Sequence, residues 1–442
     1  MRVVADRIVR LIARLTSVGW FRSVEVSGLE RVVWSGPILL VANHHGGFLD
    51  PALLAAVLPR MPRFLAMARL WTVWPVRPLL RLAGAIPVQR AVDGATGRNV
   101  HSFEAADEVL RHGGVVGIFP EGQASDLPHL LPVKTGAARI ALGARARGAR
   151  AMWVVPVGVI YERKQAARSR AFVRVGRPIE LDADAPRLLD PAGPGDESDS
   201  DAVHALTAEI ERRLAEASLD FEDAVQAADL WFAASVSLRR RGGSPSWAPR
   251  LSELERRAQL LAELPPEAQT SVRAAAIDYR HALEVNVTED RAVAAGPRGG
   301  VGAARVAAGL LTLLALPLAL VGALVNAPPA LAVHVAGRRK VEPVTLATIK
   351  FLVGVVAFPA TWLVLRYGVL DGTSEPWLWT VLLGPLCGLI AAVTADRIRR
   401  IRLARLRPAR LVVPTRVADD LLERRAWLVE SVEAAVGVPS PR

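Results

Sequence analysis

The sequence predicts an α/β domain, a sheet flanked by helices, followed by a helical accessory segment and a C-terminal transmembrane helical region. Short apolar runs alternate with helical patterns over residues 1–185, a charged helical pattern fills residues 202–300, and long apolar blocks occupy residues 301–396. Buried strands that alternate with helices form sheets covered on both faces. An uncharged apolar block of about 20 residues is long enough to span a bilayer.

Four apolar runs in the first region have the length and composition of buried strands: 37–42, 114–119, 153–160 and 171–175. Helical patterns over 101–111 and 135–148 lie between them. Two of the runs end at polar residues, the first at Asn43-His44 and the second at Pro120-Glu121-Gly122. Because sheets of this kind place their sites at the ends of strands, we expect functional residues there.

The remaining segments differ from the α/β region in composition. Residues 186–201 are rich in Pro, Gly and acidic residues, which is typical of a linker. The accessory segment over 202–300 shows no catalytic pattern and begins with an apolar stripe at helical spacing: Val203, Leu206, Ile210 and Leu214. A basic tail over 397–442, with a helix, is expected to lie in the cytoplasm.

Charge and hydrophobicity together favour a membrane protein. The 442 residues are 51% hydrophobic and carry a net charge of +12, and a basic surface of this kind binds phosphate or anionic membranes. A nucleic-acid partner is not expected, because the Arg-rich run 397–410 adjoins an apolar block and has no interleaved aromatic residues. The single cysteine, Cys387, excludes an intrachain disulfide and a zinc site built from cysteines.

The N-terminus has the spacing of an amphipathic helix rather than of a secretory signal. Its apolar positions follow helical spacing: Val4, Ile8, Leu11, Ile12 and Leu15. Four arginines accompany them: Arg2, Arg7, Arg10 and Arg14. Such a helix either lies on an anionic membrane surface or packs on its own domain, and the sequence supports both interpretations equally.

The apolar blocks predict a membrane topology. The first block, 306–336, is interrupted at Asn326-Ala327-Pro328-Pro329, and basic residues 338–340 precede the second block, 346–365. An acidic loop, 371–375, separates the second block from the third, 377–395, which more arginines follow. The positive-inside rule then favours two spans and a first block that enters and leaves on one side as a hairpin bent at the prolines. The alternative is three full spans.

An imidazole and a carboxylate lie a few residues apart after the first strand. Either His44 or His45, oriented by Asp50, could take a proton from a hydroxyl group. Gly46 and Gly47 allow a substrate to come close to the backbone. No G-x-S-x-G motif occurs, so the hydroxyl would attack an acyl carbonyl directly, without a serine intermediate.

Two further groups suit a phosphorylated alcohol. Arg90 follows a strand-like run and presents a forked donor for phosphate. Glu121 follows another strand, where it could bind a substrate hydroxyl or order the arginine. A lone His-Asp pair or a lone arginine is more often structural. Patterns 43–51, 84–90, 119–122 and 155–158, in this order at strand ends, make a common site the better interpretation.

These patterns resemble the acyltransferase blocks of the glycerolipid acyltransferase superfamily, over roughly residues 20–180. The run 119–122, followed by 134–142, is similar to bacterial glycerol-3-phosphate and dihydroxyacetone-phosphate acyltransferases. The resemblance implies an acyltransferase domain over 1–185 that moves a fatty acyl group from acyl-CoA or acyl carrier protein (ACP) to a glycerol phosphate or lysophosphatidate, in phospholipid biosynthesis. It also implies contact with membrane lipids and no metal or cofactor beyond the acyl thioester. Because the positive-inside rule places both basic clusters in the cytoplasm, we expect a multi-pass protein whose catalytic domain shares that side.

The resemblance assigns His44, His45 and Asp50 to catalysis, and assigns to substrate binding four further residues: Arg90, Glu121, Gly122 and Lys134. The usual family spacing selects His45, but the bacterial branch has an Asn-His pair, which favours His44. The arginine that often follows Pro-Glu-Gly is absent, and Lys134 could replace it. Two alternatives remain: a related acyltransferase for a glycolipid or another lysolipid, and a catalytically silent lipid-binding membrane protein.

Overall fold

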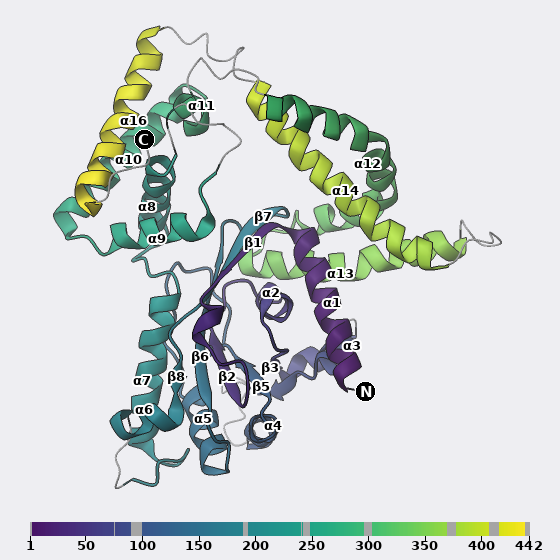
Figure 1. Cartoon of the computed structure of the whole chain (residues 1–442), viewed down its shortest axis with the longest axis vertical. Helices are drawn as coiled ribbons and strands as arrows, with labels where there is room; N and C mark the ends of the chain where they lie inside the picture. The colour runs from purple at the N-terminus through teal and green to yellow at the C-terminus, as the bar shows by residue number, and fades with distance from the viewer. Residues whose placement is uncertain are drawn as a thin grey trace. The chain divides into compact units, whose positions relative to one another are not determined.

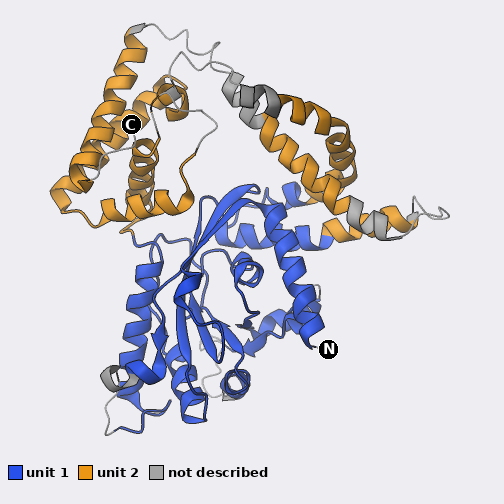
Figure 2. Ribbon diagram, in the orientation of Figure 1, with its two compact units in different colours: residues 1–220, 333–356 blue, residues 221–332, 357–442 orange. Residues whose placement is uncertain are grey.

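The computed structural model describes residues 2–74, 76–89, 100–188, 193–239, 241, 248–295, 303–368, 377–405 and 415–437. The chain divides into two compact units (Figure 2). The first unit combines Met1–Asp220 with Val333–Val356, and the second combines Phe221–Ala332 with Ala357–Arg442. A short stretch from the C-terminal half of the chain is therefore part of the N-terminal unit.

The first unit is built on an 8-stranded sheet (Figure 1). Its strands are β1 (Phe21–Ser27), β2 (Ile38–Ala42), β3 (Arg63–Met67), β4 (Ile86–Val88), β5 (Val115–Ile118), β6 (Trp153–Tyr161), β7 (Ser169–Val175) and β8 (Ile179–Glu180). The order is β1-β7-β6-β2-β5-β3-β4, with β8 paired to β6. Pairs with β2 are parallel, whereas β6 pairs antiparallel with β7 and β8. The four strands expected from the apolar runs are confirmed.

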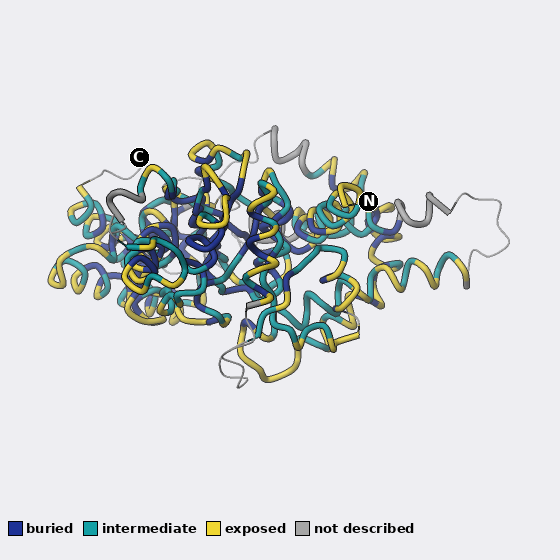
Figure 3. Tube along the Cα trace, turned by 90° about the horizontal axis from the view of Figure 1, so that it is seen from below, coloured by how far each residue is buried: buried dark blue, intermediate teal, exposed yellow. Residues whose placement is uncertain are grey.

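Helices cover both faces of this sheet, as predicted. Its helices are α1 (Arg2–Trp20), α2 (Leu49–Val57), α3 (Arg77–Ala83), α4 (Val100–Arg111), α5 (Gly136–Ala146), α6 (Leu181–Leu188) and α7 (Ser200–Ala217), with 3₁₀ turns at Leu29–Arg31 and Ala68–Thr72. Neighbouring residues of β2 point to opposite faces. Leu39 packs with α4, α5 and α7, and Leu40 packs with α2 and Trp20. Figure 3 shows buried residues inside and exposed residues on the outer turns of helices.

The boundary of the first unit differs from the expected linker at 186–201. The apolar stripe of α7, including Val203, Leu206 and Ile210, is fully buried in the same cluster as β2 and α5. Because these side chains leave water only by packing on the sheet, α7 belongs to the first unit, and the division falls at Asp220.

The second unit contains a bundle of α8 (Ala224–Ser237), α9 (Leu251–Ala262), α10 (Pro266–Val285), α11 (Asp290–Ala295) and α16 (Thr415–Val436). The tail helix α16 packs against α8 and α10. Buried Arg425 on α16 donates from Nε to Asp290 Oδ1 at 2.9 Å, and from NH2 to the carbonyl of Val236 at 3.1 Å. The predicted tail helix therefore exists, but it completes the accessory bundle instead of standing apart from it.

Three long apolar helices complete the chain: α12 (Ala303–Ala336), α13 (Pro343–Gly368) and α14 (Trp377–Arg405). The expected hairpin in the first block is wrong, because α12 runs unbroken through Pro328 and Pro329. Each proline removes a backbone donor. Near the prolines, the Asn326 side chain donates to the carbonyls of Gly322 at 2.8 Å and of Gly384 on α14 at 3.2 Å. Proline is tolerated inside a long apolar helix where a neighbouring helix packs against it.

Two helices within the described residues are long and apolar enough to cross a membrane, Gly309–Ala336 and Pro343–Tyr367. The side chains of α12 remain largely exposed, with Leu314 at 79% and Leu324 at 78%. An exposed apolar surface of this kind is typical of a helix that faces lipid or a partner. The acidic loop 371–375 lies outside the described residues.

Candidate active site

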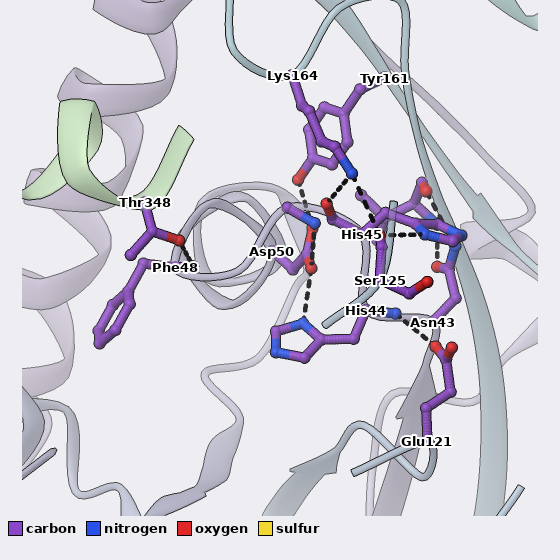
Figure 4. Close-up of polar contacts among 12 residues, drawn as sticks. Asn43, His44, His45, Phe48, Asp50, Glu121, Ser125, Tyr161, Lys164 and Thr348 are labelled. Atoms are coloured by element: carbon purple, nitrogen blue, oxygen red, sulfur yellow. Dashed lines mark hydrogen bonds and ion pairs between the residues drawn. The ribbon is translucent and has the colours of Figure 1, made fainter. Parts of the chain in front are cut away.

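The loop after β2 brings His44 and Asp50 together (Figure 4). His44 Nδ1 lies 2.8 Å from Asp50 Oδ2, and Asp50, in the first turn of α2, is fully buried. An ionised carboxylate only accepts hydrogen bonds, so Nδ1 carries the proton of this contact. The other ring nitrogen, Nε2, is then the one that can receive a proton from a substrate.

Two further donors fix the Asp50 carboxylate. The backbone N–H of Gly46 donates to Oδ2 at 2.8 Å, and the Tyr161 hydroxyl donates to Oδ1 at 2.6 Å. Burial and then the nearby Asp50 charge raise the pKa of Tyr161 well above its ordinary value, so this phenol stays protonated as a donor. Both oxygens of Asp50 are thus held in place.

Aromatic stacking sets the plane of the imidazole. The rings of His44 and Phe119 stack with centroids 4.1 Å apart, and Phe64 stacks on the other side of Phe119 at 5.6 Å. Phe119 directly follows β5, so the sheet itself orients the His44 ring. Stacking on Phe119 therefore fixes the plane of the His44 ring, and the hydrogen bond from Nδ1 to Asp50 fixes its rotation within that plane.

His45 lies in a different environment from His44. Its side chain is buried, and its Nδ1 donates to the carbonyl of Ser125 at 3.1 Å. Its Nε2 is buried without a hydrogen-bond partner. The large cavity of the first unit is lined by His44 and not by His45. The structure thus pairs Asp50 with His44 and places His45 in the supporting layer.

Glu121 holds two loops together and is not among the residues that line the cavity, so its contact with substrate stays a prediction. Its buried carboxylate accepts from the backbone N–H of His44 at 2.7 Å and from that of Leu131 at 3.1 Å. The sequence could not distinguish these backbone contacts from a substrate contact. Arg90, which Glu121 was expected to order, lies outside the described residues, although its neighbour Gln89 lines the cavity.

Gly122 and Lys134 both line the cavity. Gly122 has φ +72°, a left-handed conformation that glycine adopts without strain, and the end of the Lys134 side chain lies beside it. Helix α5 begins immediately afterwards, and Thr135, Gly136 and Arg139 line the same region. A lysine beside a helix N-terminus makes this end of the cavity attractive to an anion.

Three supporting residues were missed from the sequence. The Asn43 side chain bridges β2 to β6 through both backbone groups of Val159, at 2.7 and 3.1 Å. Lys164 donates to the carbonyls of His45 at 2.7 Å and Ser125 at 3.2 Å and pairs with Asp126. Tyr161 ends a predicted strand, so the rule that sites lie at strand ends could have found it; no local pattern marks Lys164.

The cavity has a volume of about 830 Å³, within the range of about 300–1,000 Å³ typical of ligand sites. Its wall is mainly apolar and includes Ile12 of α1, Leu65 of β3, Leu80 of α3 and Leu352 of α13. No cluster of His, Cys, Asp and Glu side chains able to hold a metal ion occurs among the described residues. The arrangement combines a base, an anion-attracting end and an apolar chamber.

Comparison with known proteins agrees with this geometry. Residues 23–160 match the family model described as Acyltransferase. Glycerol-3-phosphate O-acyltransferase 2 of Saccharomyces cerevisiae is 44% identical over 85 residues, 19% of this chain and 11% of the relative. Glycerol-3-phosphate acyltransferase of Aeromonas hydrophila is 30% identical over 157 residues, 33% of this chain and 20% of the relative. The chain thus spans only a small part of these relatives' length.

A solved structure, the 1-acyl-sn-glycerophosphate acyltransferase of Thermotoga maritima, is 19% identical with a TM-score of 0.35, covering 49% of this chain and 80% of that one. The assignment rests on the sequence matches. The fold and the His-Asp pair define an α/β domain of the acyltransferase class. Residues 23–160 thus form an acyltransferase domain, similar in sequence to parts of glycerol-3-phosphate acyltransferases.

Proposed function

We propose that this chain is a membrane-bound O-acyltransferase of phospholipid biosynthesis. It transfers a fatty acyl group from acyl-CoA or acyl-ACP to a hydroxyl of a glycerol phosphate or lysophosphatidate. The observation that carries the proposal is the pairing of His44 Nδ1 with buried Asp50 at 2.8 Å, at the wall of a largely apolar cavity that Lys134 also lines.

His44 acts as the general base in this mechanism. Its Nε2 takes the proton of the acceptor hydroxyl while that oxygen bonds to the carbonyl carbon of the thioester. The carbon–sulfur bond then breaks, and the imidazolium returns the proton to the leaving thiolate, giving an ester and a free thiol. Asp50 holds the imidazole in the required tautomer and stabilises the imidazolium. Such general-base catalysis contributes about 10²–10⁴ in rate.

The two ends of the cavity suit the two parts of the reaction. The phosphate of the acceptor binds at Lys134 and the N-terminus of α5, where positive charge and free backbone N–H groups coincide. Arg90 remains a proposed second phosphate ligand. The acyl chain occupies the apolar part of the cavity, because only an apolar group gains free energy by leaving water there.

The N-terminal helix supports attachment to a membrane surface. Its Ala13, Ser17 and Trp20 are buried on the domain, and Arg10 donates to the carbonyl of Leu58 at 2.6 Å. Its opposite side leaves a row of apolar residues exposed: Val3, Val4, Leu11, Leu15 and Val18. We propose that this row contacts lipid. One face of α1 then packs on its own domain, and the opposite face lies on the membrane surface.

Contacts inside each unit constrain the proposed topology. Helix α16 follows α14 yet packs against α8 and α10, which precede α12. Three full spans would place α16 on the opposite side of the bilayer from α8, so the packing of α16 against α8 supports an even number of crossings. Ala347 at the start of α13 is buried in the core of the first unit, which supports a topology with both ends of α12 on one side. We therefore propose that α12 lies along the cytoplasmic surface and that α14 crosses together with the second half of α13, because the first half of α13, up to Val356, belongs to the acyltransferase unit.

The activity is tested with the purified full chain in detergent micelles. Radiolabelled acyl-CoA and acyl-ACP are offered with glycerol-3-phosphate, dihydroxyacetone phosphate, lysophosphatidate and a lysolipid without a terminal phosphate. We expect transfer to a phosphorylated acceptor, lost in Asp50→Ala and His44→Ala. His45→Ala is the matched control and should retain turnover in its folded fraction. Wild-type turnover in both histidine variants, or no transfer to any acceptor, would reject the proposal.

The topology is tested with single cysteines at Ser374 and Arg400 in a Cys387→Ser background. A membrane-impermeant thiol reagent on intact cells should label position 374 and not position 400. Labelling at 400 from outside would contradict the cytoplasmic assignment, and absence of labelling at 374 in cells that label after permeabilisation would mean that α13 and α14 do not cross.

A further inference from the structure

One wall of the cavity comes from a helix far outside the acyltransferase domain. The matching domain ends at residue 160, whereas α13 begins at Pro343. Side chains of its first half line the same cavity as His44, among them Thr348, Ile349, Leu352 and Val355. We call the cavity-lining face of residues 344–355 the α13 wall. All of these residues belong to the first unit.

Polar contacts fix this wall to the loops around the candidate base. The backbone N–H of Phe48, in the loop that carries His44, donates to Thr348 Oγ1 at 3.4 Å (Figure 4). The backbone N–H of Val344 donates to Asp126 Oδ2 at 3.2 Å. Asp126 also pairs with Lys164, which holds the carbonyl of His45. The α13 wall is therefore tied to both loops that frame the site.

Close packing confirms that the α13 wall is part of the domain. Ala347 is fully buried in the cluster formed by β2 and α2, and Phe351 packs against the same cluster. Gly47 has φ +60°, and a Cβ there would lie 2.2 Å from Thr348 Oγ1. The loop that carries His44 can approach α13 this closely only because glycine stands at that position.

We infer that the α13 wall binds the acyl chain of the donor and sets the longest chain that the site accepts. This inference rests on the function proposed above and names residues for one of its substrates. The wall contributes Ile349, Leu352 and Val355 to a cavity that Ile12 and Leu80 also line. An apolar chain gains free energy with every methylene group that leaves water, so this chamber favours the acyl chain over the charged parts of either substrate.

The spacing of the α13 wall residues lets successive side chains contact successive parts of the acyl chain. Thr348, Leu352 and Val355 follow each other at four and three residues, so they lie on one face of the helix. With a rise of about 1.5 Å per residue, Leu352 and Val355 stand about 6 and 10 Å beyond Thr348 along the helix axis. Since Thr348 contacts the catalytic loop, Leu352 meets an earlier part of the chain than Val355.

The test compares two adjacent valines of α13 in the full chain. Val355 lines the cavity, whereas Val356 is 47% exposed and does not. Transfer is measured with decanoyl, tetradecanoyl and octadecanoyl donors on the carrier that supports wild-type turnover. We expect Val355→Trp to lower the octadecanoyl-to-tetradecanoyl rate ratio at least about tenfold, as overpacking would. Leu352→Trp should extend the loss to tetradecanoyl, and Val356→Trp should keep the wild-type ratio.

The ratio of two rates measured on one sample does not depend on the fraction of folded protein. If a tryptophan variant fails to fold at all, a smaller substitution provides a second test. Leu352→Ala enlarges the chamber and should raise the relative rate of the octadecanoyl donor. Wild-type ratios in Val355→Trp and Leu352→Ala, with transfer intact, would overturn the inference and leave the proposed function standing. Equal shifts in Val355→Trp and Val356→Trp would also overturn it. No transfer by the wild type with any donor would remove the proposed function and the inference with it.

Discussion

Each unit contains a buried aspartate that accepts a hydrogen bond from a tyrosine hydroxyl, Asp50 from Tyr161 at 2.6 Å and Asp290 from Tyr279 at 3.1 Å. The remaining partners differ. Asp50 is paired with one imidazole, that of His44, which lines a cavity. Asp290 is paired with two guanidinium groups, those of Arg239 at 2.8 Å and Arg425 at 2.9 Å.

The difference separates a reactive cluster from a structural one. Histidine gains and loses a proton near neutral pH, so the charge of the Asp50 cluster can change during a reaction. Arginine stays protonated, so the Asp290 cluster keeps its charges and serves to join α8, α11 and α16. A buried carboxylate therefore indicates catalysis only when its partner can titrate and can reach a substrate.

The largest expected effect is on turnover, when each aspartate becomes asparagine. Asp50→Asn keeps the shape but no longer fixes the tautomer of His44, so turnover should fall by about 10³–10⁴-fold. Asp290→Asn should lower the melting temperature and leave turnover per folded molecule unchanged. Initial rates and thermal unfolding of both variants test this contrast. Near wild-type turnover in Asp50→Asn would remove the distinction between the clusters.

The next largest effect concerns stability. Arg425→Ala leaves Asp290 with one fewer buried charge partner, which costs about 3–5 kcal/mol of unfolding free energy. Arg424→Ala is the matched control, because Arg424 is 37% exposed and its pairs with Asp278 and Asp420 lie in solvent; an exposed pair contributes under about 1 kcal/mol. Thermal unfolding followed by tryptophan fluorescence distinguishes the two. Equal losses would show that the Asp290 cluster is no more than a surface ion pair.

A smaller effect is expected at the anion end of the cavity. Lys134→Ala should raise the Michaelis constant for the phosphorylated acceptor by about 10–100-fold, the cost of one charged hydrogen bond, and leave that for the acyl donor unchanged. Lys134→Arg should restore part of the affinity. An acceptor constant that stays at the wild-type value would assign Lys134 to the support of the Gly122 turn.

The smallest effect compares the two tyrosines. Tyr161→Phe removes one donor to Asp50 and should lower turnover by about 3–30-fold, with little change in either Michaelis constant. Tyr279→Phe removes the equivalent donor to Asp290 and should change only stability, by about 1 kcal/mol. Steady-state kinetics on both variants measures the contrast. A loss of turnover in Tyr279→Phe as large as that in Tyr161→Phe would contradict it.

The sequence predicted the elements with strong local signals. The apolar runs that became β2, β5, β6 and β7 were recognised, whereas β1 carries polar residues and β8 has only two residues. The sequence placed Asp50 a few residues after a histidine pair that follows β2, and it left open whether His44 or His45 is the partner. The break predicted in α12 is wrong, because a proline pair does not by itself end a long apolar helix that packs against a neighbouring helix.

The rest of the site depends on contacts between distant segments. The interaction of Lys164 with the His45 loop spans 119 residues, and that of Thr348 with Phe48 spans 300. No local pattern specifies such pairs. Glu121 shows the same limit, because a carboxylate after a strand can face either a ligand or the backbone of a neighbouring loop, and only the fold decides between them.

The return of α13 and α16 to earlier segments has a consequence for synthesis. A ribosome adds about 5–20 residues per second, and domains generally fold as units from the N-terminus onward. Here the first unit cannot complete its fold until residues up to Val356 have been synthesised. The ion pair of Asp290 with Arg425 likewise cannot form until Arg425 has been added. During that interval the cavity of the nascent chain lacks the α13 wall, and the Asp290 carboxylate lacks the guanidinium group of Arg425. A ribosome that stalls before residue 356 would release a chain whose sheet is present but whose chamber lacks one wall.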